Sequence, residues 1–441
     1  MELKRISLAG LGRLGSPMTA ALASKGFPVI GLDADPLRTA GLNKGLTPVY
    51  EPGLQKLVSA HKEKLSGTQD YSHAVQNSDA TFLVVPTPSE PDGGFSLKHV
   101  LDAGGRIGDA LRNKEGWHLV ILTSTVMPGS TGNVLRPLLE ARSGKKCGRD
   151  FGLCYNPEFI ALGSVIRDFL NPDLVLIGES DPEAGRVLEG LYAKVCDNKP
   201  SVVRMSFVNA ELTKLSINTF VTTKITFANT LARICENLPG ADVDVVTSAL
   251  GRDSRIGAKY LKGAVGYGGP CFPRDNLALA KLARKLNTPS LLADATDQFN
   301  RQQVRWLADL IKRHLPPQGV AGILGLAYKP DSDVVEESQG LLLAQILAAD
   351  GVSVAAYDPI AMENARGVLG KGVRLVSSAE ECIRASDVVA VATAWKEFEK
   401  IPPAVFARAG GTRTVVDCWR QFPQMEGQAG IRYLPLGIGR C

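Results

Sequence analysis

The sequence predicts two doubly wound α/β domains joined by a helical central domain that contains one long helix. Residues 5–36 run as strand, Gly-rich turn, helix and strand, and residues 320–359 repeat that order. Between them, residues 207–237 keep a helical apolar period and contain neither Gly nor Pro. A chain of 441 residues is long enough for two or three domains with cores of their own.

The composition indicates a globular protein of the cytoplasm. Of the residues, 44% are hydrophobic and 22% charged, and no apolar run approaches the roughly 20 residues of a membrane span. The N-terminus enters a strand pattern directly, without a signal-peptide layout. Because the net charge of +5 is scattered, we expect no nucleic-acid partner and no membrane partner. The eight cysteines have no CxxC pair or metal-ligand spacing, so we expect free thiols and no metal.

The first strand, turn and helix match the dinucleotide-binding pattern G-x-G-x-x-G, with Gly10, Gly12 and Gly15. Gly10 permits the tight turn, Gly12 lets a pyrophosphate approach the backbone, and Gly15 allows close packing of helix on strand. Asp33 ends the second strand, where a carboxylate accepts hydrogen bonds from a ribose diol and repels a 2′-phosphate. These residues predict NAD as the cofactor, with Arg38 as a nearby cation that could accommodate NADP instead.

The second α/β segment echoes the first but lacks the glycine pattern. Asp358 takes the place of Asp33, and the strand after Ser386 corresponds to the strand after Ser78. We therefore expect two Rossmann-like domains, of which the second holds another ligand in its loops. The expected domains are 1–200 for NAD binding, 201–317 for the helical centre with the dimer contacts and the Cys271 loop, and 318–441 for the nucleotide sugar.

The most unusual segment is the Gly-rich loop that presents Cys271. Four glycines precede this cysteine, at positions 263, 266, 268 and 269, and such density indicates close backbone approach or strained φ angles. Lys262 and Arg274 flank the loop, and cationic neighbours favour the thiolate. The other cysteines suit the simpler interpretation of small buried side chains.

A nicotinamide cofactor together with a nucleophilic thiol predicts a four-electron oxidation. One hydride transfer turns an alcohol into an aldehyde, to which the thiol adds. The resulting thiohemiacetal can lose a second hydride and become a thioester, which water converts into an acid.

The motifs along the chain resemble those of the UDP-glucose/GDP-mannose dehydrogenase family over nearly the whole length. The matching pieces are GLGRLG, VYEPGL at 49–54, VPTP at 85–88, STV at 124–126, NPEF at 156–159, AELTKLSINTF at 210–220, GYGGPCFPRD at 266–275, LAYKPDSD at 326–333 and YDP at 357–359. The RIG triplet and the VGYGG run are closer to the UDP-glucose branch. The resemblance implies NAD-dependent oxidation of a nucleotide sugar, UDP-glucose to UDP-glucuronate. Because long helices with apolar residues beyond one face often form dimer interfaces, we expect a homodimer or higher homo-oligomer.

The resemblance also implies roles for individual residues. Catalysis falls to Cys271, Lys214, Asn218, Asp275, Glu158 and Thr125. Cofactor contacts fall to Gly10, Gly12, Gly15, Asp33, Arg38, Thr87, Thr125 and Arg274. Substrate contacts fall to Glu158, Phe159, Lys214, Asn218, Arg255, Tyr260, Lys262, Gly268, Lys329 and Arg420. Cys271 is then the nucleophile, and Lys214 stabilises oxyanions. Glu158 acts as a base in thioester hydrolysis, while Asp275 either orients water or supports Lys214.

Several positions depart from the family pattern. Leu162 and Leu174 replace an acid and an Arg, Pro270 replaces a Ser, Arg274 replaces a Lys, and Glu336 replaces an Arg. These changes leave the nucleophile and its helix partners intact, and bear on the sugar, the nucleotide base and the affinity for NAD.

Two other functions fit parts of the pattern. A single-hydride hydroxyacid-type dehydrogenase shares the domain order and the Lys–Asn helix pair, but has no need of the Cys271 loop. A sensor of NAD or nucleotide sugars would keep the fold and lose the catalytic side chains. Within the family, GDP-mannose, UDP-N-acetylhexosamine and TDP-glucose are alternative substrates.

Overall fold

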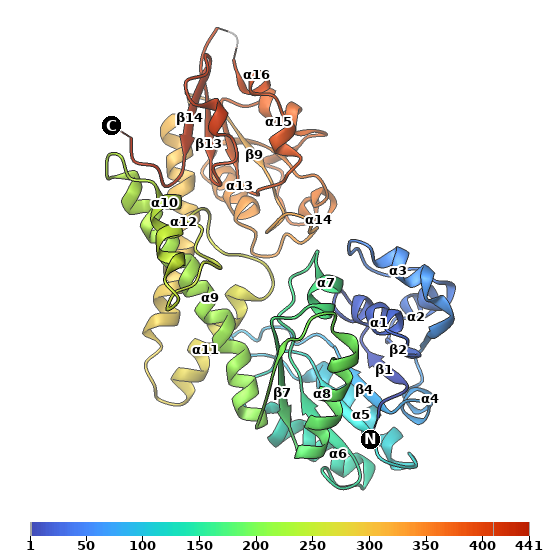
Figure 1. Cartoon of the computed structure of the whole chain (residues 1–441). Coiled ribbons are helices and arrows are strands. Elements are labelled where there is room, and N and C mark those ends of the chain that lie inside the picture. Colours follow the sequence, from blue (N-terminus) through green and yellow to red (C-terminus); the bar gives the residue numbers. More distant parts are fainter. Residues whose placement is uncertain (1, 409, 441) are drawn as a thin grey trace. The chain divides into compact units, whose positions relative to one another are not determined.

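The computed structural model describes residues 2–408 and 410–440, which form two compact units (Figure 1). The N-terminal unit extends to Ser216, and the C-terminal unit begins at Ile217. None of the seven cysteines in the described part of the chain forms a disulfide, whereas Cys441 lies outside the described residues.

The N-terminal unit is built on an eight-stranded sheet in the order β3-β2-β1-β4-β5-β6-β7-β8. The strands are β1 Ile6–Ala9, β2 Val29–Leu32, β3 Leu65–Thr68, β4 Ala80–Leu83, β5 Leu119–Leu122, β6 Gly152–Tyr155, β7 Leu174–Glu179 and β8 Ser201–Met205. Neighbouring strands are parallel except for β6 and β7. The first half of this order is that of a doubly wound nucleotide-binding fold.

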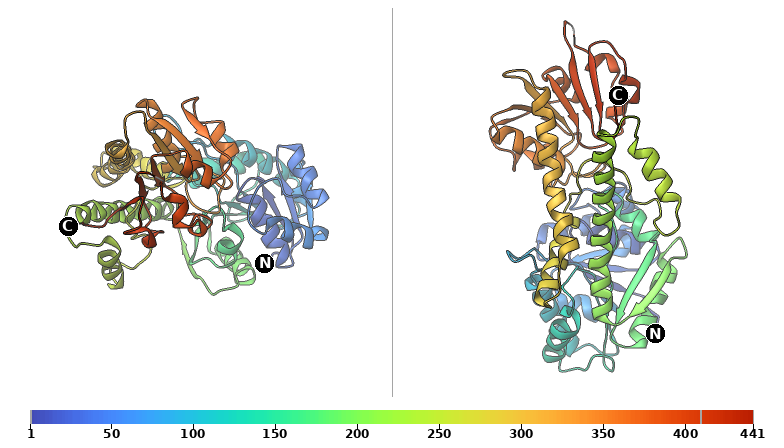
Figure 2. Two further views of the ribbon diagram at one scale, coloured as in Figure 1. Left: turned by 90° about the horizontal axis from the view of Figure 1, so that it is seen from above. Right: turned by 90° about the vertical axis from the view of Figure 1, so that its left-hand side faces the viewer.

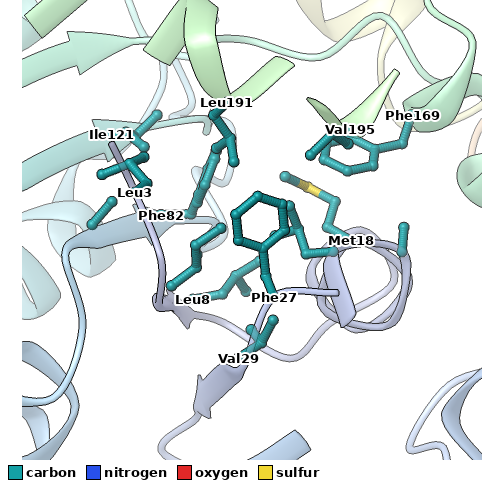
Figure 3. Packing of buried hydrophobic residues seen from close by; sticks show 14 of the residues in the cluster. Leu3, Leu8, Met18, Phe27, Val29, Phe82, Ile121, Phe169, Leu191 and Val195 are labelled. Atoms are coloured by element: carbon teal, nitrogen blue, oxygen red, sulfur yellow. The ribbon is translucent and has the colours of Figure 1, made fainter. Parts of the chain in front are cut away.

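Helices cover both faces of this sheet, so its central strands are buried on both sides. The helices are α1 Gly15–Ser24, α2 Pro36–Lys44, α3 Leu54–Ala60, α4 Tyr71–Gln76, α5 Lys98–Arg112, α6 Arg136–Ser143, α7 Val165–Leu170 and α8 Pro182–Val195. One core cluster joins the sheet to α1, α7 and α8, and Figure 3 shows Met18, Phe169 and Leu191 meeting in it. The cluster on the other face includes Val75 of α4 and Ile107 of α5.

The C-terminal unit contains a six-stranded parallel sheet in the order β11-β10-β9-β12-β13-β14. Its strands are β9 Val320–Leu324, β10 Ser353–Tyr357, β11 Val373–Leu375, β12 Val388–Val391, β13 Arg413–Asp417 and β14 Ile431–Pro435. Its helices are α10 Val243–Arg252, α11 Phe272–Lys285, α12 Leu291–His314, α13 Gln339–Ala349, α14 Met362–Arg366, α15 Ala379–Arg384 and α16 Pro403–Phe406. The order repeats that of the first sheet, which confirms the predicted echo between the two α/β segments.

A Ser-Asp pair in each sheet shows how closely the two segments correspond. The hydroxyls of Ser78 and Ser386 donate to the carbonyl oxygens four residues before them, at 2.8 and 2.7 Å. The next residue in each pair, Asp79 or Asp387, uses its carboxylate to accept a backbone N–H at the start of the sheet's central strand. The same sequence pair thus ends a helix and begins a strand in both units.

The predicted long helix is α9 Phe207–Glu236, which passes from one unit into the other. Figure 2 shows its length beside the second long helix, α12. Within the C-terminal unit the guanidinium of Arg233 on α9 lies 4.1 Å from the ring centre of Trp306 on α12, a cation–π contact between the two helices. Among the described residues, no helix combines the length and apolarity that a membrane crossing requires.

A buried histidine makes the stability of the N-terminal unit depend on pH. His118 is fully buried beside β5, with Nε2 2.8 Å from the Thr81 hydroxyl and Nδ1 3.2 Å from the carbonyl oxygen of Ser78. Burial, reinforced by the positive charge of Lys114, lowers the pKa of His118 to about 3. At pH values between about 3 and 6.5, His118 is protonated in the unfolded chain but neutral in the folded chain, so a fall in pH through this range favours unfolding.

We therefore expect the N-terminal unit to lose about 2 kcal/mol of stability at His118 as the pH falls from 7 to 5. Chemical denaturation at both pH values measures this loss. The matched variant is His118→Gln, which keeps one donor and one acceptor and does not titrate. Equal losses in the two proteins would show that His118 is not the group responsible.

Candidate active site

The Gly-rich turn after β1 has the geometry that a dinucleotide phosphate needs. Gly10 has a φ of +109°, which only glycine adopts easily, and a side chain at Gly15 would collide with the carbonyl oxygen of Gly10. At Gly12, by contrast, nothing lies within 4 Å of an added Cβ, so the backbone is open to a ligand. Helix α1 follows without an acidic residue in its first turn, so its N–H groups face this space without a competing carboxylate. The turn therefore fits NAD.

Asp33 lies beside this turn, at the end of β2. Its Oδ2 accepts the N–H of Leu11 at 2.7 Å and lies 3.3 Å from a guanidinium nitrogen of Arg38, while Oδ1 accepts the N–H of Asp35. Its side chain is 11% exposed, so the carboxylate edge remains within reach of a ribose. The structure thus brings together Asp33, Arg38 and the glycines that the sequence had selected.

Two predicted cofactor residues meet where β4 and β5 end. The hydroxyl of Thr87 donates to the carbonyl oxygen of Thr125 at 2.8 Å. The hydroxyl of the neighbouring Ser124 donates to Val85 and accepts from the N–H of the same residue. The VPTP and STV motifs are therefore one structure, at the carboxyl edge where doubly wound sheets bind their ligands.

The NPEF motif, which follows β6, holds the predicted catalytic lysine. The Nζ of Lys214 on α9 donates to the carbonyl oxygen of Glu158 at 2.8 Å and lies 4.7 Å from the ring centre of Phe159. Lys214 is 6% exposed, so these two residues fix its ammonium group in a protected place. A positioned ammonium group of this kind can stabilise an oxyanion.

Glu158 carries the most informative electrostatic feature of the site. Burial raises the pKa of its carboxyl to about 7, against the opposing effects of the Tyr192 hydroxyl and the Lys214 ammonium group. A carboxyl that titrates near neutral pH can exchange protons with substrate or water. Tyr192, whose hydroxyl lies 2.8 Å from Glu158 Oε1, was not among the residues selected from the sequence.

Cys271 lies at the start of α11 and is exposed, unlike the other six described cysteines, which are buried or half-buried. The end of the Gly-rich loop leads into it: Gly269 has a φ of +82°, and an added Cβ there would lie 2.6 Å from the ring of Tyr328. The N-terminus of a 14-residue helix favours a thiolate at this position.

Four carboxamide side chains hold the loop before Cys271. Asn229 of α9 bonds to the N–H of Ala264 and the carbonyl of Val265. The remaining three reach the same stretch from α12 and α13, and are Asn300, Gln303 and Gln339. Sequence reasoning missed all four, because amides on helices carry no distinctive spacing.

Asp275 and Asn218 form a buried pair one helical turn after Cys271. The Nδ2 of Asn218 donates to Asp275 Oδ2 at 2.6 Å, and the N–H of Asp275 donates to the carbonyl oxygen of Cys271 at 2.8 Å. Asp275 is fully buried, and its Oδ1 lies 3.5 Å from the Nε of Arg274. The C-terminal unit thus brings together Cys271, Asn218, Arg274 and Asp275.

Three of the predicted substrate residues surround the same loop. The ring of Tyr260 packs edge-on against Phe272, with centroids 6.2 Å apart, and remains 51% exposed. Gly268 passes so close to the carbonyl oxygen of Glu337 that a side chain would not fit. The ammonium group of Lys329 lies 5.9 Å from the ring of Tyr328, the residue that covers Gly269.

Three further predicted substrate residues form ion pairs with protein side chains. The guanidinium of Arg255 pairs with Asp253, and Lys262 lies 3.5 Å from Asp244. Arg420 is almost buried and forms a bidentate pair with Asp244 at 2.7 and 2.9 Å. It also donates to the carbonyl oxygens of Gly263 and Leu436. These bonds connect three segments of the C-terminal unit, so the contacts of Arg420 are those of a structural residue.

The departures from the family pattern differ in their surroundings. Leu162, Leu174 and Pro270 are half-buried, whereas Glu336 is exposed and its carbonyl oxygen accepts the N–H of Gly269 at 3.0 Å. Glu336 therefore lies against the Cys271 loop.

One acidic residue in the VYEPGL motif and one in the AELTKLSINTF motif accept backbone hydrogen bonds that the sequence did not reveal. Glu51 accepts the N–H groups of Gly163 and Val165, just after the NPEF motif. Glu211 likewise accepts those of Gly129 and Thr131, just after the STV motif.

Three family models match consecutive parts of the chain. They describe the NAD binding domain of the UDP-glucose/GDP-mannose dehydrogenase family at residues 4–196, its central domain at 193–302 and its UDP binding domain at 322–424. The chain belongs to the UDP-glucose/GDP-mannose dehydrogenase family. It is an NAD-dependent dehydrogenase of nucleotide sugars, as the motifs predicted.

Relatives and solved structures agree with this assignment. A UDP-glucose 6-dehydrogenase of Haloferax volcanii is 36% identical over 96% of this chain and 98% of its own length. A GDP-mannose 6-dehydrogenase of Pseudomonas aeruginosa is 34% identical over 80% of this chain and 81% of its own. The structure of a UDP-glucose dehydrogenase from Pyrobaculum islandicum matches with a TM-score of 0.88 and 34% identity, covering 98% of this chain and 97% of that one.

The geometry at Asp33 predicts how the protein discriminates between cofactors. We expect NAD to be preferred over NADP. In Asp33→Asn the ratio of catalytic efficiencies with NAD and NADP should fall about 5- to 150-fold, because repulsion of a 2′-phosphate by one carboxylate costs about 1–3 kcal/mol. Asn keeps an oxygen for the N–H of Leu11. Catalytic efficiency with each cofactor measures the ratio.

The matched control is Asp358→Asn, which changes the corresponding aspartate of the other sheet and should leave the ratio alone. Equal efficiency of the unchanged protein with NAD and NADP would contradict the prediction and point to Arg38 as the compensating group.

Proposed function

We propose that the protein oxidises UDP-glucose to UDP-glucuronate, with Cys271 as the covalent nucleophile. The observation that supports this proposal most strongly is the position of Cys271. Its thiol is exposed at the N-terminus of a helix and follows a loop whose backbone is held by protein side chains. A single-hydride dehydrogenase has no use for such a thiol.

The proposed reaction uses the thiol to make the second oxidation possible. NAD, when bound, accepts the hydride in each of the two oxidations. Between them, the Cys271 thiolate adds to the aldehyde carbon, which becomes tetrahedral while its carbonyl oxygen becomes an oxyanion or hydroxyl. Loss of the second hydride leaves a thioester on Cys271. Water attacks the thioester carbon, the carbon–sulfur bond breaks, and the thiolate and the carboxylate are released.

Lys214 and Asn218 lie one turn apart on α9, and we assign both to the reacting carbon. The ammonium group of Lys214 stabilises the oxyanion that forms at each addition. The Asn218–Asp275 pair fixes the first turn of α11, and Asp275 orients water or supports Lys214. Thr125 organises the hydrolytic water and contacts the cofactor.

Glu158 is the proposed base for hydrolysis. Its carboxylate takes a proton from water as that water attacks the thioester, and its pKa near 7 suits both accepting and releasing the proton.

The remaining assignments concern ligand contacts. We assign NAD to Gly10, Gly12, Gly15, Asp33, Arg38, Thr87, Thr125 and Arg274. We assign the nucleotide sugar to Glu158, Phe159, Lys214, Asn218, Arg255, Tyr260, Lys262, Gly268, Lys329 and Arg420, where cations suit a diphosphate. For Arg420 a substrate contact has to compete with its bonds to Asp244.

Two further observations support the proposed assembly and location. Phe220, Phe227 and Ile234 recur every seven residues on α9 and are 65%, 53% and 54% exposed, which favours a homo-oligomer formed through this helix. The described free thiols favour the cytoplasm. The division into domains 1–200, 201–317 and 318–441 is part of the same proposal.

We expect UDP-glucose to yield two NADH for each UDP-glucuronate, and GDP-mannose, TDP-glucose and UDP-N-acetylhexosamines to react much more slowly. Cys271→Ser should reduce acid formation at least about a thousandfold, because a hydroxyl is a far weaker nucleophile than a thiolate. NADH absorbance and chromatography of the sugar product measure both.

Cys147→Ser is the matched control, since Cys147 is half-buried and burial raises the pKa of its thiol. One NADH for each substrate consumed, or near-normal acid formation by Cys271→Ser, would exclude the thioester route.

The pKa of Glu158 predicts a pH dependence for thioester hydrolysis. Only the ionised carboxylate can take the proton from water, so the rate should fall as the pH drops below about 7 and approach a tenfold loss for each further pH unit. Glu158→Gln should remove this acid limb and slow hydrolysis about 10²- to 10⁴-fold. Single-turnover decay of the thioester over pH 5–9 is the measurement. An unchanged acid limb in the Gln variant would assign it to another group.

A further inference from the structure

Glu158 belongs to a chain of three buried polar groups in the N-terminal unit. The hydroxyl oxygen of Tyr192, on α8, lies 2.8 Å from Glu158 Oε1 and 2.6 Å from Asn156 Oδ1. Tyr192 is 3% exposed, and its ring meets that of Phe169 edge-on at 6.1 Å. The hydroxyl therefore has a fixed place between a carboxyl and an amide.

The hydroxyl has one proton and two acceptors. The amide of Asn156 is oriented by its Nδ2, which donates to the carbonyl oxygen of Leu176 at 2.9 Å, so that its oxygen faces Tyr192. An amide oxygen and a carboxylate oxygen both accept and cannot donate. At any moment Tyr192 can donate to only one of them.

The charge of Glu158 decides which acceptor receives the proton. An ionised carboxylate forms a charge-assisted hydrogen bond, which is about twice as strong as one to a neutral amide. When water delivers a proton to Oε2, Oε1 becomes the carbonyl oxygen of a neutral acid and a weaker acceptor than the amide. The hydroxyl proton then turns toward Asn156.

We propose that Tyr192 is a positioning residue for Glu158: it holds the carboxyl in place and turns its single hydroxyl proton between Glu158 and Asn156 as Glu158 gains and loses a proton. This inference rests on the proposed function only for the importance of Glu158 in hydrolysis. The bond that changes is a hydrogen bond, since the hydroxyl rotates and keeps its own proton.

Other titratable groups around the carboxyl do not duplicate this role. The Lys214 ammonium group lowers the pKa of Glu158 by its charge, but donates a hydrogen bond to the backbone oxygen of that residue. The Cys196 thiol lies near both Glu158 and Tyr192, and burial raises its pKa to about 11, so it stays neutral. Tyr192 is neutral for the same reason, because burial raises its pKa.

The two partners of Tyr192 predict opposite effects on the pKa of Glu158. Tyr192→Phe removes a donor to the carboxylate, so the pKa should rise by about one pH unit. Asn156→Ala removes the competing acceptor, so the pKa should fall by about half a unit. In the double variant Asn156→Ala should add no shift, because the amide acts only through the hydroxyl.

Infrared difference titration of the full-length protein measures this pKa directly, with the carboxyl band identified by its loss in Glu158→Gln. Tyr433→Phe is the matched control, because Tyr433 is a buried tyrosine of the other sheet whose hydroxyl donates to the Asp417 carboxylate at 2.9 Å. It removes the same kind of bond and should leave the Glu158 band unchanged. If Tyr192→Phe does not fold, the downward shift in Asn156→Ala still tests the proposal.

Three results would overturn the inference: no shift in a folded Tyr192→Phe, shifts of the same sign in both single variants, or an Asn156→Ala effect that persists without the Tyr192 hydroxyl. The pH dependence of thioester hydrolysis, recorded on the same variants, separates the role of Tyr192 from the proposed role of Glu158 as the base. If the infrared pKa moves as expected and this pH dependence does not follow, the role of Tyr192 stands and Glu158 is not the base.

Discussion

The buried backbone of residues 264–267 needs hydrogen-bond partners, and side-chain amides supply them. This stretch lies outside any helix or strand, so its peptide groups have no regular partners, and leaving them unpaired would cost about 1–3 kcal/mol each. Asn229, Asn300, Gln303 and Gln339 reach it from three helices. Because an amide both donates and accepts, it can satisfy an N–H and a carbonyl of the same loop. The position of Cys271 depends on these bonds.

The two catalytic carboxyls of the proposed site have different surroundings, which suits different duties. Glu158 is desolvated and has one hydroxyl and one amine nearby, so its pKa lies close to neutrality. Asp275 has an amide donor at one oxygen and a guanidinium near the other, in a fully buried position. These surroundings suit Glu158 for proton exchange and suit Asp275 for holding the first turn of α11 in place.

The sequence was sufficient for features that are local or periodic. The two α/β repeats, the helix from Phe207 and the loop at Cys271 all follow from spacing and glycine content. Tyr192 was missed because its importance lies in a contact with Glu158, 34 residues away, while its own surroundings in the sequence are those of an ordinary helix. Arg420 was given a substrate contact from its motif, and only the fold reveals that Asp244, 176 residues earlier, accepts its guanidinium.

The corresponding aspartates of the two sheets differ in how much hydrogen-bonding capacity they retain. A carboxylate offers about four lone-pair positions. Asp358 accepts from Leu326, Ala327, Ile360, Ala361 and Trp395, five donors within the described part of the chain. Asp33 accepts from Leu11, Asp35 and Arg38, and one of these donors is a side chain with 39% exposure. The same amino acid at corresponding positions of two similar sheets can thus keep lone pairs for an outside donor or use them all within the protein, depending on how many neighbouring groups donate to it.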